Sequence, residues 1–129
     1  MKIMLVDDEP GILRVERIIL EKAGYEVVEA SSGEECLEKL KSVKPDLILM
    51  DVMMPEMDGW EATRIIKEDD DTKNIPVVIV TVKDSDDEKT RSYMYSHADG
   101  HLVKPLSMGE LLETVSWVFN FYGKKIKEA

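Results

Sequence analysis

The stretch Asp46–Asp51 reads DLILMD, with four apolar residues in a row between two aspartates. A second run, Val77–Val80, reads VVIV and directly follows Pro76. Neither run alternates with polar residues, as a strand with one face in water would. Short continuous apolar runs of this kind fit strands of a parallel sheet that is covered on both faces. We therefore predict a parallel sheet with helices on both sides.

Three more apolar segments extend this pattern over the whole chain. Amphipathic stretches with the apolar spacing of helices lie between them. Strand and helix alternate five times, which indicates an α/β doubly wound fold with right-handed crossovers. The five predicted strands are Lys2–Val6, Tyr25–Ala30, Asp46–Met50, Val77–Thr81 and His101–Val103.

The predicted helices carry residues that favour helix ends. Pro10 opens the first amphipathic stretch and Gly24 closes it, which is the usual asymmetry of helix termini. Ser32, Ser85 and Ser107 are each followed three residues later by a glutamate, which is the pattern of a capping box.

Length and composition predict one domain with one core. The chain has 129 residues, of which 43% are hydrophobic, and this argues against disorder. The last helix is predicted from Ser107 to about Tyr122. We therefore expect one domain at residues 1–122 and a short tail at 123–129, with no room for a further, output domain. A single cysteine, Cys36, and the lack of a signal peptide or of an apolar run of about 20 residues favour the cytoplasm.

The net charge of -10 limits the classes of partner. A chain this acidic is repelled by the phosphates of nucleic acids and by anionic lipids. We therefore expect no direct binding to nucleic acid or to membranes.

Polar residues follow the predicted strands at their carboxyl ends. In an open α/β sheet, ligands bind in the crevice beyond these ends. Each such residue alone has an ordinary structural explanation, such as a helix start or a turn. Their joint placement on one edge of the sheet is harder to explain in that way. The residues are Asp7, Asp8, Asp51, Thr81 and Lys104.

Carboxylates that crowd together at one edge repel one another unless a cation joins them. Oxygen ligands without histidine or cysteine fit a hard cation such as Mg2+ or Mn2+. Lys104 can offset the charge of a transferring phosphoryl group, and Thr81 can donate a hydrogen bond to it. A carboxylate such as Asp51 can act as the nucleophile and form an acyl phosphate. The residues therefore predict metal-assisted phosphoryl transfer onto an aspartate.

Four segments, in this order, resemble the receiver domains of two-component response regulators. They are LVDDEP at Leu5–Pro10, DLILMDVMMPEMDG at Asp46–Gly59, Val80-Thr81, and LVKP at Leu102–Pro105. The resemblance covers essentially the whole chain. It implies a flavodoxin-like (βα)5 fold with strand order 2-1-3-4-5 and helices on both faces.

The resemblance also implies roles for individual residues. Asp51 matches the residue that accepts the phosphoryl group. Asp8 matches a direct metal ligand, and Asp7 matches its neighbour, which usually acts through water. Met53 matches the position that gives its backbone carbonyl to the metal, so its side chain does not forbid that role.

Two further positions match the residues that respond to the phosphoryl group. Thr81 matches the hydroxyl that senses the group, and Lys104 matches the ammonium that pairs with it. Phosphorylation in such domains changes a binding surface made of the fourth helix, the fifth strand and the fifth helix. The position of His101 usually holds Tyr or Phe, whose ring turns inward on activation. Because imidazole titrates near neutral pH, His101 predicts an output that depends on pH.

The resemblance implies a sensor histidine kinase or a phosphotransfer protein as the donor and a downstream effector protein as the reader. The chain itself is expected to be a monomer or a weak homodimer. Two other interpretations stay open. One is an adaptor that has the receiver fold but works without phosphorylation. The other is a hydrolase of small phosphorylated molecules, which the lack of material for a substrate-binding cap disfavours.

Overall fold

The computed structural model describes residues 1–81, 99–103 and 107–128, and of residues 81, 103 and 122–128 it describes the main chain alone. Five parallel strands form one sheet in the order β2-β1-β3-β4-β5. This confirms the predicted fold class and strand order. The strands are β1 (Lys2–Val6), β2 (Glu26–Ala30), β3 (Leu47–Asp51), β4 (Val77–Thr81) and β5 (Gly100–Val103).

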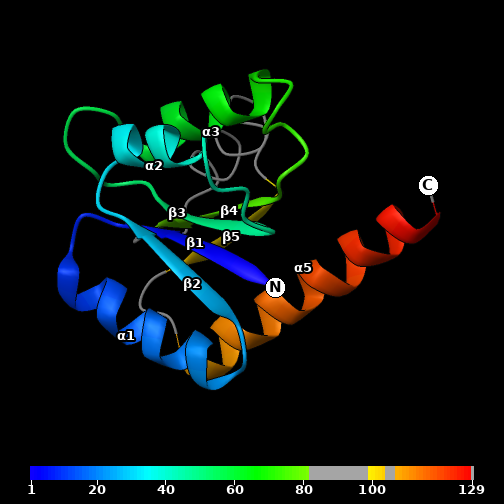
Figure 1. Ribbon diagram of the computed structural model, residues 1–129. Helices are drawn as coiled ribbons and strands as arrows, with labels where there is room; N and C mark the ends of the chain where they lie inside the picture. Colours follow the sequence, from blue (N-terminus) through cyan, green and yellow to red (C-terminus); the bar gives the residue numbers. More distant parts are fainter. Residues whose placement is uncertain (82–98, 104–106, 129) are drawn as a thin grey trace.

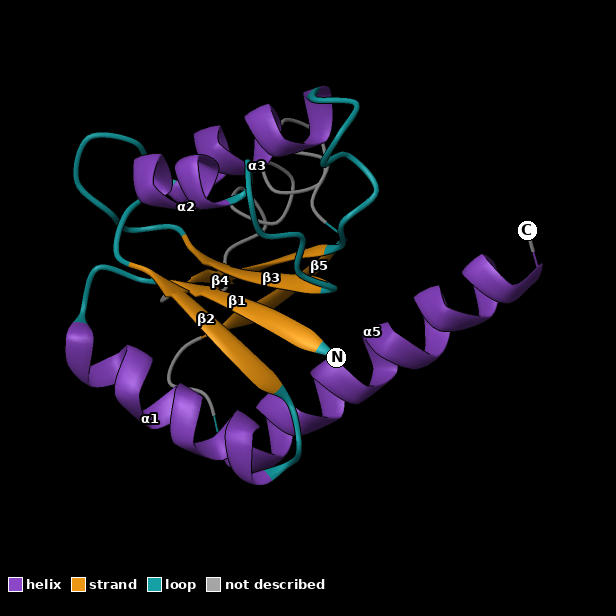
Figure 2. Ribbon diagram, viewed as in Figure 1, coloured by secondary structure: helices purple, strands orange, loops and turns teal. Residues whose placement is uncertain are grey.

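Four described helices cover the two faces of the sheet. Figures 1 and 2 show α1 and α5 below the sheet and α2 and α3 above it. A helix between β4 and β5 was also predicted, but that segment, including Ser85, lies outside the described residues. The described helices are α1 (Pro10–Lys22), α2 (Gly33–Lys39), α3 (Gly59–Glu68) and α5 (Met108–Glu128).

The sheet divides the apolar core into two clusters. Successive side chains of a strand point to opposite faces, so β1, β2, β3 and β4 each contribute to both clusters. In β3, Ile48 and Met50 pack with α2 and α3, while Leu47 and Leu49 pack with α1 and α5. Every residue of β3 is buried, which explains the unbroken apolar run in the sequence.

The predicted helix ends are present where the structure describes them. Pro10 is the first residue of α1, and Gly24 follows its end with a φ of +96°. The hydroxyl oxygen of Ser32 accepts a hydrogen bond from the backbone N–H of Glu35 at 3.0 Å. Ser107 accepts one from the backbone N–H of Glu110, also at 3.0 Å. Each cap satisfies an N–H group that has no partner within its own helix.

Helix α5 is longer than predicted. It continues to Glu128, whereas the sequence analysis ended it near Tyr122 and assigned the rest to a tail. The prediction followed the apolar spacing of the helix, which does not extend past Tyr122. The lysines that follow are favourable at the C-terminal end of a helix, where the helix dipole is negative. None of the described helices combines the length and the apolarity that crossing a bilayer requires.

An ion pair closes the edge of the sheet where the strands begin. Lys67 of α3 lies 2.6 Å from a carboxylate oxygen of Asp99, and the two side chains are 9% and 18% exposed. Lys67 also donates to the backbone oxygen of Ile75 at 2.7 Å. The same oxygen of Asp99 accepts from the backbone N–H of Val77 at 2.7 Å. These bonds join α3 to the starts of β4 and β5.

Candidate functional site

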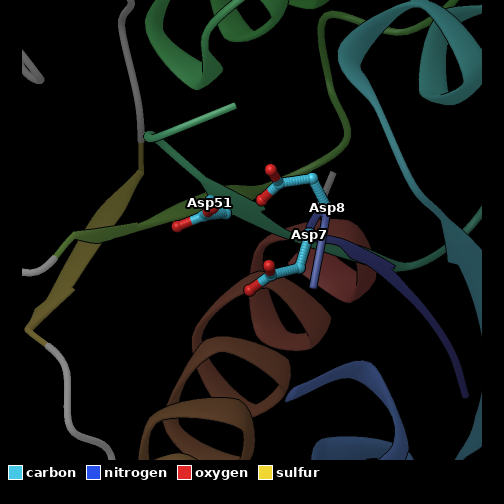
Figure 3. Close-up of side chains that lie close together, drawn as sticks. All are labelled: Asp7, Asp8 and Asp51. Atoms are coloured by element: carbon cyan, nitrogen blue, oxygen red, sulfur yellow. The ribbon is translucent and has the colours of Figure 1, made fainter. Parts of the chain in front are cut away.

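Three aspartates meet at the carboxyl edge of the sheet. Each of Asp7, Asp8 and Asp51 offers a carboxylate oxygen, and these oxygens all lie within 4.8 Å of one another. Figure 3 shows the three side chains gathered in front of the ends of β1 and β3. The sequence analysis placed these residues at one edge, and the structure brings them together.

The pairing of the two central strands explains this geometry. Val6 of β1 lies opposite Met50 of β3 in the parallel register. Asp7 follows Val6 just beyond the end of β1, and Asp51 follows Met50 as the last residue of β3, so the two aspartates emerge side by side. Asp8 follows one residue later, where the chain leaves the sheet.

The three carboxylates differ in their exposure to water. Asp7 and Asp51 are 3% and 4% exposed, while Asp8 is exposed. A carboxylate oxygen of Asp7 accepts a hydrogen bond from the backbone N–H of Glu9 at 3.0 Å. This bond fixes Asp7 against the start of α1. The site therefore has a buried floor, made by Asp7 and Asp51, and one open side at Asp8.

A glycine packs directly against the backbone of Asp51. A Cβ atom placed on Gly59 would lie 2.2 Å from the carbonyl oxygen of Asp51 and 2.9 Å from its carbonyl carbon. The backbone N–H of Gly59 donates to the carbonyl oxygen of Val52 at 3.1 Å. The first residue of α3 is thus in contact with the backbone at the end of β3. The sequence analysis named Gly59 only as the end of a segment that resembles the family, because nothing local in the sequence reports this close approach.

The donor set of the site fits a divalent cation. Three carboxylates within 4.8 Å of one another concentrate negative charge that a cation would offset. All three donors are oxygen atoms, which suits Mg2+ or Mn2+ better than a metal that prefers nitrogen or sulfur. Asp8 lies on the exposed side, where an ion can enter.

The structure describes the other predicted site residues only in part. Thr81 is the last residue of β4, and its main chain lies opposite Val103 of β5. His101 lies in β5 opposite Ile79 and is half-buried. Met53 follows β3 by two residues, and its side chain is 66% exposed, so its predicted role rests on the backbone alone. Lys104 lies outside the described residues.

Comparison with known proteins adds an independent finding. The family model of the response regulator receiver domain matches residues 3–116. This range contains every predicted site residue and all of the described strands apart from Lys2, the first residue of β1.

The chain is also similar to individual proteins along most of its length. It is 37% identical to protein PilH of Pseudomonas aeruginosa over 117 residues, which cover 91% of this chain and 96% of PilH. The structure of chemotaxis protein CheY4 of Vibrio cholerae matches with a TM-score of 0.86 and 34% identity, covering 91% of this chain and 97% of that one. The transcriptional regulatory protein PhoP of Bacillus subtilis is 38% identical over 110 residues, which cover 85% of this chain but only 45% of PhoP.

Proposed function

Because this chain belongs to the response regulator receiver family, we propose that Asp51 accepts a phosphoryl group and so switches a protein-binding surface. The observation that carries the proposal is the convergence of Asp7, Asp8 and Asp51 at the carboxyl edge of the sheet. A receiver that served only as an adaptor would not need three carboxylates to be held together against their mutual repulsion.

The proposed reaction moves a phosphoryl group from a phosphohistidine to Asp51. A carboxylate oxygen of Asp51 attacks the phosphorus atom and forms a P–O bond. The P–N bond of the donor breaks, and the ring nitrogen keeps its electron pair. The product is an acyl phosphate on Asp51 and an unmodified histidine on the donor. Burial of Asp51 holds the nucleophile in one place, which favours an in-line attack.

We propose that Asp7, Asp8, Asp51 and the backbone carbonyl of Met53 hold Mg2+ or Mn2+. When bound, the ion offsets the charge of the carboxylates and of the transferring phosphoryl group. By the family resemblance, Lys104 pairs with the phosphoryl group and Thr81 donates a hydrogen bond to it. Thr81 and His101 then pass the change on to the binding surface.

The proposed partners follow from this chemistry. A sensor histidine kinase or a phosphotransfer protein supplies the phosphoryl group. A downstream effector protein reads the surface of the fourth helix, β5 and α5. We propose that the receiver unit, residues 1–122, acts in the cytoplasm through such partners and without direct contact to nucleic acid or membrane.

Mass spectrometry tests the acceptor. The protein is incubated with acetyl phosphate and Mg2+, and the intact mass is compared among wild type, Asp51→Asn and Asp70→Asn. Asp70 is an exposed aspartate that pairs only with Lys73 among the described residues, so it controls for loss of a carboxylate elsewhere. We expect one phosphoryl adduct on wild type and Asp70→Asn, and none on Asp51→Asn.

An unmodified wild type would count against the proposal if a known receiver reacts under the same conditions. The chain would then be an adaptor that works without phosphorylation. An adduct that persists in Asp51→Asn would place the acceptor at another residue.

A further inference from the structure

The loop between β3 and α3, residues 52–58, joins the proposed acceptor Asp51 to the helix above the sheet. Its residue Met53 offers the backbone carbonyl that we propose as a ligand of the cation. Glu56 has a φ of +67°, which a residue with a side chain rarely adopts. Such a conformation persists only where the surrounding structure holds it in place. The β3–α3 loop therefore needs contacts outside itself to keep its shape.

Met57 supplies such a contact, because its side chain lies against Gly33, the first residue of α2. A Cβ atom placed on Gly33 would lie 3.1 Å from both Cγ and Sδ of Met57, so the methionine fills the space beside the glycine. Met57 is half-buried and packs against the apolar cluster on this face of the sheet. Figures 1 and 2 show α2 and α3 side by side above the sheet. Met57 thus ties the loop to α2, one residue beyond the strained position.

The turn before α2 also contacts the other half of the acidic site. The backbone oxygen of Ala30, the last residue of β2, accepts a hydrogen bond from the backbone N–H of Asp7 at 3.1 Å. The side chain of Ser32 caps the helix that Gly33 begins. One short turn therefore contacts both the segment that carries Asp7 and the loop that follows Asp51. None of the residues of this turn belongs to the predicted site.

We propose that Met57 is a positioning residue for the cation site, because its contact with Gly33 keeps the β3–α3 loop in the conformation that serves the three carboxylates. This role rests on the proposed function, since it requires that the carboxylates hold a divalent cation. Met57 offers the ion no ligand and acts through the backbone of the loop. Substitution of residues that support metal ligands typically weakens metal affinity about 10- to 100-fold. A methionine that only filled the core would change the stability of the fold and leave the affinity as it is.

Titration of the full chain with MgCl2, followed by NMR, measures the Kd of the ion. Met57→Ala is expected to raise this Kd by about tenfold. Met57→Leu nearly keeps the volume of the side chain and should stay within about twofold of wild type. Ile75→Ala is the matched control, because Ile75 is also partly buried against the same cluster but precedes β4, at the opposite edge of the sheet. It should lower the stability against urea and leave the Kd unchanged.

Amide hydrogen exchange tests the β3–α3 loop itself, without any metal. The N–H groups of Met54 and Gly59 both donate to the backbone oxygen of Val52, at 3.0 Å and 3.1 Å. In Met57→Ala these two groups should exchange at least about tenfold faster relative to the amides of β3, because the loop opens locally more often. Ile75→Ala should leave this ratio unchanged.

A second substitution tests the contact with Gly33. Gly33→Ala places a methyl group 3.1 Å from Met57, and it should also raise the Kd of Mg2+, since the methionine must move. In the Met57→Ala background the same methyl group meets no methionine, so Gly33→Ala should have no further effect. Additive effects of the two substitutions would overturn the contact as the cause.

A wild type that binds Mg2+ no more tightly than Met57→Ala does would overturn the positioning role and leave the proposed function intact. Equal rises of the Kd in Met57→Ala and Ile75→Ala would also overturn it, because the effect would then come from lost stability. A wild type that binds no Mg2+ would overturn the proposed cation site as well.

Discussion

At position 59 the fold requires glycine, the residue without a side chain. The start of α3 approaches the carbonyl group of Asp51 so closely that a Cβ atom would overlap it. Because both contacting groups are backbone, neither can turn aside as a flexible side chain could. Any larger residue must push the end of β3, and with it the carboxylate of Asp51, out of place.

We therefore expect Gly59→Ala to lower the free energy of unfolding by about 2–4 kcal/mol, the range of substitutions that force a backbone shift. Denaturation by urea measures the change. The control is Gly11→Ala, since a Cβ at Gly11 in α1 meets nothing within 4 Å. That variant should be neutral or more stable, because alanine favours helix over glycine. Equal stability of Gly59→Ala and wild type would contradict the close approach.

The thiol of Cys36 makes the stability depend on pH. Burial, and to a smaller extent the nearby carboxylate of Glu35, raises the pKa of Cys36 from 9.0 to about 12. As the pH rises, the thiolate forms first in the unfolded chain. The stability that the neutral thiol provides is therefore complete below pH 9.0 and is lost as the pH rises toward about 12.

Urea denaturation from pH 8 to 11 checks this expectation, because the loss amounts to about 1.4 kcal/mol per pH unit within the window. Cys36→Ala keeps every other titrating group and should show a flatter profile. A thiol reagent should also react with Cys36 only as fast as the protein unfolds. Parallel profiles for the two proteins would contradict the assignment.

The residues of the site could be predicted from the sequence to different degrees. Asp7, Asp8 and Asp51 could be predicted, because each follows an apolar run and parallel strands end at one edge. The importance of Gly59 could not, because the atoms that it approaches belong to another element. Met53 could be named only from the family resemblance, since a backbone carbonyl leaves no mark in the sequence.

At the scale of elements, Lys67 connects three segments that are far apart in the sequence. Its ammonium group bonds to Asp99 and to the backbone before β4, and Asp99 in turn fixes the first N–H of β4. No local pattern predicts this, because 32 residues separate the two charges. A lysine near a helix end is ordinarily read as solvated.

We expect Lys67→Met to lower the free energy of unfolding by about 2–4 kcal/mol, because it leaves the largely buried carboxylate of Asp99 without this cation. Thermal or urea unfolding measures the loss. Lys41→Met is the control, since Lys41 and Glu38 form a pair that is 74% exposed on both sides. Removing that pair should cost less than about 0.5 kcal/mol. A loss of similar size in both variants would mean that the pair of Lys67 and Asp99 contributes no more to the free energy of unfolding than an exposed pair does.

Most elements could be predicted, and the exceptions have physical causes. Strands β1, β3 and β4 were found because burial on both faces leaves unbroken apolar runs, and the caps because they are local hydrogen bonds. The end of α5 was placed too early, because the apolar spacing stops near Tyr122 while the lysines that follow stabilise the helix end.

At the scale of the whole molecule, the three carboxylates should make the stability depend on divalent cations. Mg2+ that binds only the folded chain raises the free energy of unfolding by about 2.7 kcal/mol when its concentration is 100 times the Kd. We expect this gain in wild type and in Asp70→Asn. Asp8→Asn should lose most of it, and should be more stable than wild type without Mg2+, because one like charge is gone.

Thermal unfolding with and without MgCl2 measures the gain, with NaCl added to match the ionic strength. The same gain in Asp8→Asn as in wild type would place the ion elsewhere.

Because the core is divided in two, the side chains on one face of the sheet can be replaced by those of a related protein. The cluster under α1 and α5 and the cluster under α2 and α3 meet only through the backbone of the sheet, because alternate side chains of each strand serve opposite faces. Substitutions in one layer therefore need few compensating changes in the other. A hybrid that takes α2, α3 and the side chains of their face from a relative should fold on the remaining half of this chain. The two halves can thus diverge separately while Asp51 stays anchored in the strand they share.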